Sequence, residues 1–498
     1  MKPRAAAILA ILLIAASLAA SAPARPRNPL KIAILPWGND SPGGAFAAGR
    51  TAFPYEVIHR LTYIRALTVR PMEAGLPYLS NATSAGRIRA ELDVDVFLTG
   101  SYRRGEDTLS VDLLLRGSEG DDSGQSVAIS VRFAEAGSLP AMIAGEICRL
   151  LKVSLSQDEK TKLKGDAPTD GAAYDSYLQG VAARLGPPSD LEASLRLLKR
   201  SVERDPSFAP ALSALGDSYL LLSGEVGGLK GFYREAEEAF TAALRLNPAM
   251  PTTLQQFGML HTKTGSSEKA AVLFKQGLRL NPNVAALYAG LGYVFRYAGR
   301  MRESIDMYRR AARMDASAKN RIDCGMQILK SQIYLGAYRR AERTFQEVLA
   351  LHAEQGSRPD EKDLFYGGVV RLYAGDKEGA VSLFDAALAE DPKSLWSAFG
   401  KAYREALLGR NVAVADIAAG IEERNEVDGE RRYRLVHIYA LAGRPRDALR
   451  MLESSIAAGF FNYPCFRKDP LLAGLRAEKE FASLLNLAKD RHLKFKTK

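Results

Sequence analysis

A recurring Asp-Pro or Asn-Pro dipeptide constrains the fold of this chain more than any other feature of its sequence. The dipeptides are Asp205-Pro206, Asn247-Pro248, Asn281-Pro282 and Asp391-Pro392. Pro248 and Pro282 are 34 residues apart, and proline ends a helix because it lacks the N–H that the helix needs. A fixed period of this length indicates a stack of equivalent helix pairs rather than one closed core.

Residues inside each period keep the same register. Small residues are needed where the two helices of a pair cross, and they stand at matched places in three consecutive units. The matched sets are Leu215-Gly216, Ala236, Phe240 and Ala243; Phe257-Gly258, Ala270, Phe274 and Gly277; and Leu291-Gly292, Ser304, Tyr308 and Ala311. This is the pattern of tetratricopeptide repeats, and about seven or eight of them are predicted over residues 166–460. Insertions at 223–231 and 352–362 are predicted to be exposed loops.

Stacked helix pairs form a superhelix with a concave groove, because one pair cannot bury its own apolar face. In tetratricopeptide proteins the first helix of each pair lines that groove. The register places ten residues there: Lys263, Tyr293, Arg296, Tyr297, Lys330, Tyr334, Phe365, Tyr373, Tyr433 and His437. Aromatic rings with interspersed cations suit a peptide that carries acidic groups. The alternative is that the tyrosines pack against the next repeat.

Residues 30–165 show a different pattern, in which short apolar runs alternate with segments of helical period. Strands are predicted at 31–37, 66–71, 94–100, 109–115 and 126–133, and helices at 45–61, 84–92 and 139–155. The last two strands are joined by a turn-rich segment, 117–124, which is typical of a hairpin. We therefore expect an α/β N-terminal domain followed by an all-α tetratricopeptide superhelical solenoid.

Three stretches of this domain are similar to a known family. They are Ile32-Ala-Ile-Leu-Pro36, Glu91-Leu-Asp-Val-Asp-Val-Phe-Leu-Thr-Gly-Ser-Tyr102 and Val153-Ser-Leu-Ser-Gln-Asp-Glu159. They resemble the TolB N-terminal-like domain that occurs in bacterial chains fused to tetratricopeptide repeats. This chain departs from such fusions by a longer glycine-rich loop at 38–49 and by having no cyclase, kinase or winged-helix module, so their signalling output is not implied. The final stretch, 461–498, resembles the ending of such chains, which implies a solenoid cap with a basic tail.

Two local patterns in the N-terminal domain look like sites and are predicted not to be. The Gly43-Gly44 pair lies between a strand and a helix but lacks the lysine of a phosphate-binding loop. Asp93 and Asp95 would point to the same face at the start of a strand. We interpret them as a solvated strand end rather than as a catalytic carboxylate pair.

The first residues and the cysteines bear on location. Residues 1–24 combine a charged start with an apolar run, Ala5 to Ala22, which is the pattern of a secretory signal peptide. The run is also near the shortest length for an uncleaved membrane anchor. We expect an exported protein of the periplasm or cell envelope that touches a membrane only through this segment. Cys148, Cys324 and Cys465 are predicted to be buried thiols, with a Cys324–Cys465 disulfide as the alternative.

The residue types present argue against catalysis. The five histidines stand in no metal-binding or catalytic-triad spacing, and no cofactor or metal is predicted. A formal charge of +11 favours an acidic partner, but no compact basic cluster points to nucleic acid. We predict a scaffold or adaptor that binds a protein or peptide in the solenoid groove, in cell-envelope assembly or signalling. The alternative is a sensory module that binds a small molecule through the α/β domain.

Overall fold

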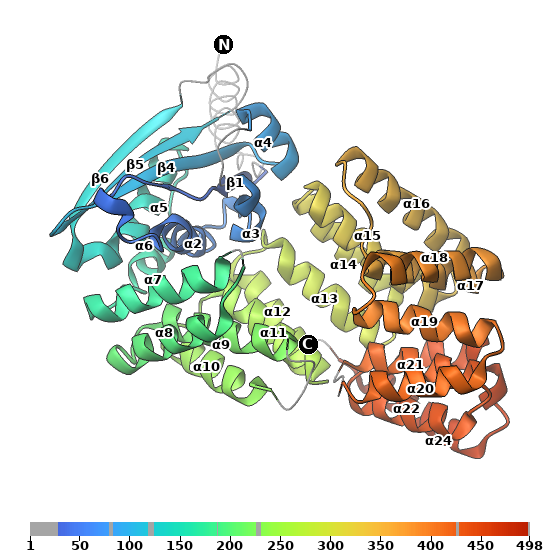
Figure 1. Cartoon of the computed structure of the whole chain (residues 1–498). Coiled ribbons are helices and arrows are strands. Elements are labelled where there is room, and N and C mark those ends of the chain that lie inside the picture. Colours follow the sequence, from blue (N-terminus) through green and yellow to red (C-terminus); the bar gives the residue numbers. More distant parts are fainter. Residues whose placement is uncertain are drawn as a thin grey trace, which may run out of the picture.

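The computed structural model describes residues 28–78, 83–117, 124–186, 188–225, 231–424 and 428–496. It consists of an α/β region followed by a long array of paired helices (Figure 1). This is the predicted fold class. The predicted signal segment, 1–24, and most of the predicted insertion at 223–231 lie outside the described residues.

One mixed sheet organises the α/β region. Its strands are β1 (Leu30–Ile34), β2 (Gly38–Asn39), β3 (Leu67–Val69), β4 (Val96–Arg104), β5 (Thr108–Arg116) and β6 (Gln125–Arg132). The order is β3-β1-β4-β5-β6, and β2 pairs with β4. β1 runs parallel to β3 and β4, whereas β4, β5 and β6 are antiparallel. The predicted hairpin at 109–133 is therefore confirmed.

Helices cover both faces of the first strand, which explains why the residues from Ile32 to Leu35 are all apolar. Ile32 and Ile34 pack with α2 (Gly49–Leu61) and α5 (Leu139–Leu150). Ala33 and Leu35 point to the opposite face and pack with α4 (Ala85–Leu92). The short helices α3 (Met72–Gly75) and α6 (Gln157–Lys164) complete the region.

Eight helix pairs follow within the described residues, in agreement with the predicted seven or eight repeats. They are α7/α8 (Gly171–Leu185, Leu191–Arg204), α9/α10 (Ala209–Glu225, Tyr233–Leu246), α11/α12 (Pro251–Lys263, Ser267–Leu280), α13/α14 (Ala285–Tyr297, Met301–Met314), α15/α16 (Ala318–Leu335, Tyr338–Glu354), α17/α18 (Glu361–Tyr373, Lys377–Glu390), α19/α20 (Leu395–Leu407, Asn411–Glu422) and α21/α22 (Gly429–Leu441, Pro445–Ala457). Small residues stand where the helices cross because there is no room for larger side chains. A Cβ at Gly258 would lie 2.5 Å from the Phe274 ring.

One sequence expectation in the array needs correction. The insertion predicted at 352–362 is shorter as a loop, because α16 continues to Glu354 and α17 begins at Glu361. His352 is buried at the end of α16, where its Nε2 lies 3.1 Å from an Asp363 carboxylate oxygen. All three cysteines are free and buried, as predicted, and Cys324 is not bonded to Cys465. Within the described part of the chain no helix is long and apolar enough to cross a membrane.

The repeat junctions hold the α/β region against the array. The first residue of each junction accepts, through Oδ1, the backbone N–H two residues further on; these residues are Asp205, Asn247, Asn281 and Asp315. The other polar atom of the side chain, Nδ2 in asparagine or Oδ2 in aspartate, can then bond to residues outside the junction. Asn247 donates to Asp166 over 2.7 Å and to the hydroxyl of Tyr63 over 3.4 Å, and Asn281 donates to the carbonyl of Thr62 over 2.9 Å. The repeat motif therefore also forms a row of contacts to the N-terminal region.

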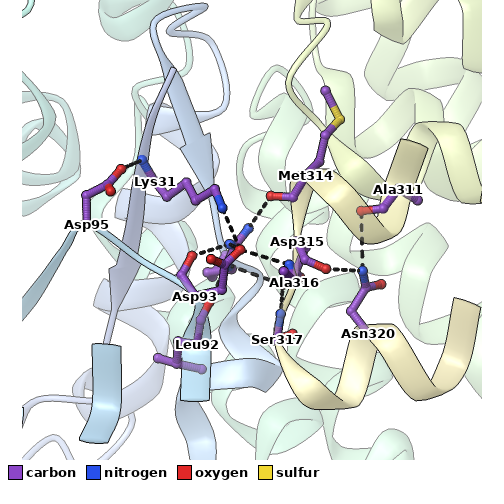
Figure 2. Close-up of polar contacts among 11 residues, drawn as sticks. Lys31, Leu92, Asp93, Asp95, Ala311, Met314, Asp315, Ala316, Ser317 and Asn320 are labelled. Carbon is purple, nitrogen blue, oxygen red and sulfur yellow. Dashed lines mark hydrogen bonds and ion pairs between the residues drawn. The ribbon is translucent and has the colours of Figure 1, made fainter. Parts of the chain in front are cut away.

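Arg70, just after β3, extends this row to the next junction. Its guanidinium lies 3.4 Å from Asp315 and 2.9 Å from Asp93, and it donates to the carbonyl of Met314 over 3.2 Å. Asp93 also accepts from Lys31 Nζ at 2.6 Å and from the backbone N–H of Ala316 at 2.8 Å (Figure 2). Asp93 is thus not a solvated strand end. It caps α4 in the left-handed conformation and joins the two regions.

A single apolar core runs from the sheet into the first repeats. It contains Ile34 and Leu61 from the α/β region together with Tyr177, Leu198 and Phe240 from the helix pairs. The boundary predicted at 165/166 is therefore a change of architecture and not a break in packing. A second core extends from α12 to the C-terminus.

Candidate functional site

The ten predicted groove residues all lie on the first helix of their pair, on α11, α13, α15, α17 or α21. Seven of them are buried, and Lys263, Tyr293 and Tyr373 are partly buried. The side chain of Arg296 has no exposed surface. Their positions follow the predicted register, but their surroundings are those of an interior and not of an open groove.

The chain's own C-terminus covers this concave face. After α22, residues 460–475 form α23 (Tyr463–Lys468) and the short helix η4 (Pro470–Leu475), and we call this segment the C-terminal plug. The N–H of Phe461 donates to the carbonyl of Tyr297 over 3.1 Å, and Phe460 and Phe466 are fully buried. The last helix, α24 (Lys479–Lys494), returns to α13, where His492 Nδ1 lies 2.7 Å from the carbonyl of Ala298. The plug therefore closes the groove as well as capping the last repeat.

An aspartate of the plug is bound by three of the predicted residues. One carboxylate oxygen of Asp469 accepts from Tyr433 at 2.6 Å and Tyr373 at 2.8 Å, and lies 3.0 Å from His437 Nε2. Burial lowers the pKa of His437, so the ring is neutral at pH 7. Nε2–H then donates to Asp469 while Nδ1 accepts from Tyr403 at 2.8 Å. Burial alone would raise the pKa of Asp469, but His437 and the hydrogen bonds lower it to about 2.

A second buried carboxylate joins α13 and α15 to α21. Glu430 accepts from Arg296 at 3.0 Å and from Tyr334 at 2.7 Å. Burial would raise the pKa of Glu430, but the charges of Arg296, Lys330 and Arg434 outweigh it and lower the pKa to about 2. Beside this cluster, Tyr293 donates to Asp428 over 2.5 Å. These pairs join residues that are 96 to 135 apart in the sequence.

The remaining predicted residues are dispersed. Phe365 packs against Phe384 of its own helix pair and against Phe399 of the next one. Lys330 is buried, with its ammonium 4.1 Å from the centre of the Tyr366 ring. Lys263 is partly buried at the end of α11, and its charge acts on Asp217. The structure thus brings most of the ten residues together, but around the chain's own acidic groups.

An opening lies beside the plug, a cavity of about 410 Å³. Tyr334, Tyr338 and Tyr373 form its wall, with Tyr338 and Tyr373 stacked at 5.0 Å. Its rim carries four basic side chains, Arg300, Arg302, Lys468 and His492, and two acidic ones, Glu303 and Asp469. Arg302 and Lys468 are exposed. Of the ten predicted groove residues, Tyr334 and Tyr373 line this opening.

The acidic residues of the plug and of α21 were not identified from sequence. Asp469-Pro470 repeats the dipeptide of the repeat junctions, which was the one local signal available for Asp469. Asp428 and Glu430 have no such signal, because their partners are distant in the chain. Among the described residues no group of three or more His, Cys, Asp or Glu side chains is placed to hold a metal ion.

Comparisons with known proteins agree on the helical repeats. The family model described as tetratricopeptide repeat matches residues 256–319. Anaphase-promoting complex subunit 3 of Schizosaccharomyces pombe is 25% identical over 122 residues, which is 24% of this chain and 17% of that protein. The match therefore spans less than a fifth of that relative. These findings confirm the tetratricopeptide part of the prediction, whereas the TolB-like resemblance stays a prediction.

Solved structures similar to part of the chain include those of PilF and PilW. PilF of Pseudomonas aeruginosa matches with 18% identity and a TM-score of 0.35, covering 45% of this chain and 95% of PilF. PilW, titled a type IV pilus biogenesis factor, has 14% identity and a TM-score of 0.38, covering 45% of this chain and 96% of PilW. A tetratricopeptide repeat protein from Parabacteroides merdae has 15% identity and a TM-score of 0.34, covering 55% and 99%. At these TM-scores the likeness says nothing about function.

Proposed function

We propose that this protein is an exported, non-catalytic scaffold that binds an acidic segment of a protein partner at the opening beside the C-terminal plug. The tetratricopeptide repeats support this proposal, because stacked repeats present long continuous surfaces that suit protein binding. The charged start and apolar run within residues 1–24 support export. A role in envelope assembly or signalling is the biological context that we propose.

The chemistry of the plug supports an acidic ligand. The concave face binds Asp469 through tyrosine hydroxyls and a neutral histidine, and it binds Glu430 through an arginine and a tyrosine. The opening continues the same surface with stacked tyrosines, and its basic rim groups outnumber the acidic ones. A carboxylate of a partner would meet these cations without the full cost of burial, because Arg302 and Lys468 are exposed.

The proposed role of the ten groove residues changes accordingly. Tyr334 and Tyr373 reach the opening and are proposed to touch the partner. Arg296, Tyr433 and His437 are proposed to act indirectly, by holding the plug and the last repeat in place. A partner that used the whole groove would have to displace the plug and expose its buried phenylalanines, which is costly at about 25 cal/mol per Å² of apolar surface.

The experiment is affinity capture from the envelope fraction of the source cells with the full chain as bait. The full chain is required because the α/β region and the first repeats share one core. The test variant is Arg302→Glu combined with Lys468→Glu, and the control is Lys401→Glu, an exposed lysine on α19 outside the opening. We expect the test variant to lose at least ten-fold in retention of one protein, while the control keeps it. Equal retention by both variants would contradict the proposal.

A further inference from the structure

A second cavity lies between the α/β region and the first repeats. Its volume is about 380 Å³, within the range of about 300–1,000 Å³ that is typical of small-molecule sites. One wall is built by α2, β3 and α3, and the other by α7, α9, α11, α13 and α15. The cavity exists only because the N-terminal region docks on the repeats, so a molecule inside it would touch both.

The charges in this cavity are mostly paired within the protein. Arg184 Nη1 lies 3.1 Å from Asp217 and 4.0 Å from Glu73 at the rim. Arg70 is paired with Asp315, and Asp323 is paired with Lys319 at 3.0 Å. Burial, together with Arg184 and Arg60, lowers the pKa of His59 to about 3, so its ring is neutral. The two arginines of the wall are each paired with carboxylates, so the wall offers no free cation that would select an anionic ligand.

Two wall residues carry buried polar atoms without a hydrogen-bond partner in the described part of the chain. They are the amide oxygen of Gln327, which is an acceptor, and Nε and Nη2 of Arg184, which are donors. The side chain of Arg184 is only 4% exposed. Unsatisfied buried groups are rare in folded proteins and call for a missing partner. Here the partner has to accept and donate hydrogen bonds.

From this arrangement we infer that the cavity binds a small uncharged molecule rich in hydroxyl groups, of the size of one or two sugar rings. Hydroxyl groups can accept from Arg184 and can donate to Gln327. A carboxylate cannot donate to Gln327 and would stand beside Asp217 and Glu73. An ammonium group can donate to Gln327 but cannot accept from Arg184. The aromatic pair of Tyr55 and His59, with ring centres 4.5 Å apart, gives an apolar surface for the carbon face of a ring.

Further neutral hydrogen-bonding groups converge from the repeats. Thr252, Gln255 and Gln256 stand on the first turns of α11, and Asn320 stands on α15. Thr252 lies 3.0 Å from Nδ1 of His59, so α11 and α2 are already joined at the cavity. The bound molecule would stabilise the docked arrangement of the two regions by mass action.

The test measures binding of uncharged sugars to the full chain. The probes are glucose, N-acetylglucosamine and maltose, with glucuronate and glucosamine as charged counterparts, in titration calorimetry and thermal unfolding. We expect saturable binding and a raised Tm with at least one uncharged probe, and at least ten-fold weaker binding of both charged probes. Absence of saturable binding for all three uncharged probes, or equal binding of a charged one, would overturn the inference.

Two variants locate the binding. Ala286→Trp places a large side chain at the exposed mouth of the cavity and should abolish binding. The control is Ala353→Trp, at an exposed position of α16, which should leave binding unchanged. Gln327→Met removes the unpartnered acceptor and should weaken binding about ten-fold while the Tm without sugar stays the same or rises. Wild-type affinity in the Gln327→Met variant, or in a folded Ala286→Trp variant, would overturn the assignment.

Discussion

Replacing Asp469 by asparagine tests the C-terminal plug with the smallest change of shape. The carboxylate accepts hydrogen bonds from Tyr373, Tyr433 and His437 and, through its other oxygen, from the N–H of Leu471 at 3.0 Å. Asparagine keeps one acceptor oxygen. Its amide group has to face a donor, and the charge that the surrounding donors stabilise is lost.

The size of the effect follows from the pKa of Asp469. The pKa is about 2 in the folded chain, against an ordinary value of about 3.9 in an unfolded one. This difference corresponds to about 3 kcal/mol of stability at pH 7. We therefore expect Asp469→Asn to destabilise the C-terminal half by about 2–3 kcal/mol.

The pH dependence has a definite sign. Because the folded pKa is depressed, the stabilisation is present above pH about 4 and is lost as the pH falls through about 2. Wild type and Asp469→Asn should therefore differ at pH 7 and converge near pH 2. Glu430, whose pKa is also about 2, is expected to lose its contribution over the same range.

The assay is urea unfolding followed by the fluorescence of Trp396 in a Trp37→Phe background. Trp396 packs against Phe365 in the second core, so it reports on the half that contains the plug. The control is Asp391→Asn, an exposed repeat-junction carboxylate that bonds only to its own turn. An unchanged transition at pH 7, or a difference that persists at pH 2, would refute the account of the plug.

Three further predictions concern the docking of the α/β region and the repeat packing. Arg70→Ala should destabilise the N-terminal half by about 3–5 kcal/mol, measured by Trp37 fluorescence in urea, because it leaves buried Asp315 without its cation. In the same assay Asn281→Ala should cost about 1–3 kcal/mol, since the carbonyl of Thr62 loses its donor. Asp391→Ala, followed by Trp396 fluorescence because Asp391 lies in the C-terminal half, should cost at most about 1 kcal/mol. Gly258→Ala should lower stability by about 1–3 kcal/mol by overpacking against Phe274, as calorimetry would show; a neutral effect would mean that the helix crossing can expand.

Local periodicity predicted most of the architecture. The alternation in β5, with Leu109, Val111, Leu113 and Leu115 buried, is visible in the sequence because successive side chains of a strand point to opposite faces. The helix pairs are visible because small residues recur where helices cross. Such patterns depend on neighbours within one repeat, so a single sequence contains all the information that they need.

The candidate site was predicted only in part, for the same reason. A repeat register assigns Tyr433 and His437 to the concave side, but it does not say what covers that side. The answer depends on Asp469, 32 residues after His437, and on Glu430, which meets Arg296 across 134 residues. No local pattern links such partners, because their proximity follows from the accumulated curvature of several repeats.

The Asx residues at the repeat junctions mark the boundary between what sequence determined and what tertiary structure decided. The sequence by itself determined that Asn247 and Asn281 end one repeat and begin the next, since proline follows and Oδ1 caps the turn. Only the tertiary structure decided what the other polar atom of each side chain, besides Oδ1, binds. That atom binds the α/β region from Asn247 and Asn281, whereas the junction at Asp391 is exposed. The same dipeptide therefore contacts the α/β region at Asn247 and Asn281 but faces solvent at Asp391. Capping needs only residues within the same turn, whereas docking depends on which part of the folded chain lies opposite the junction.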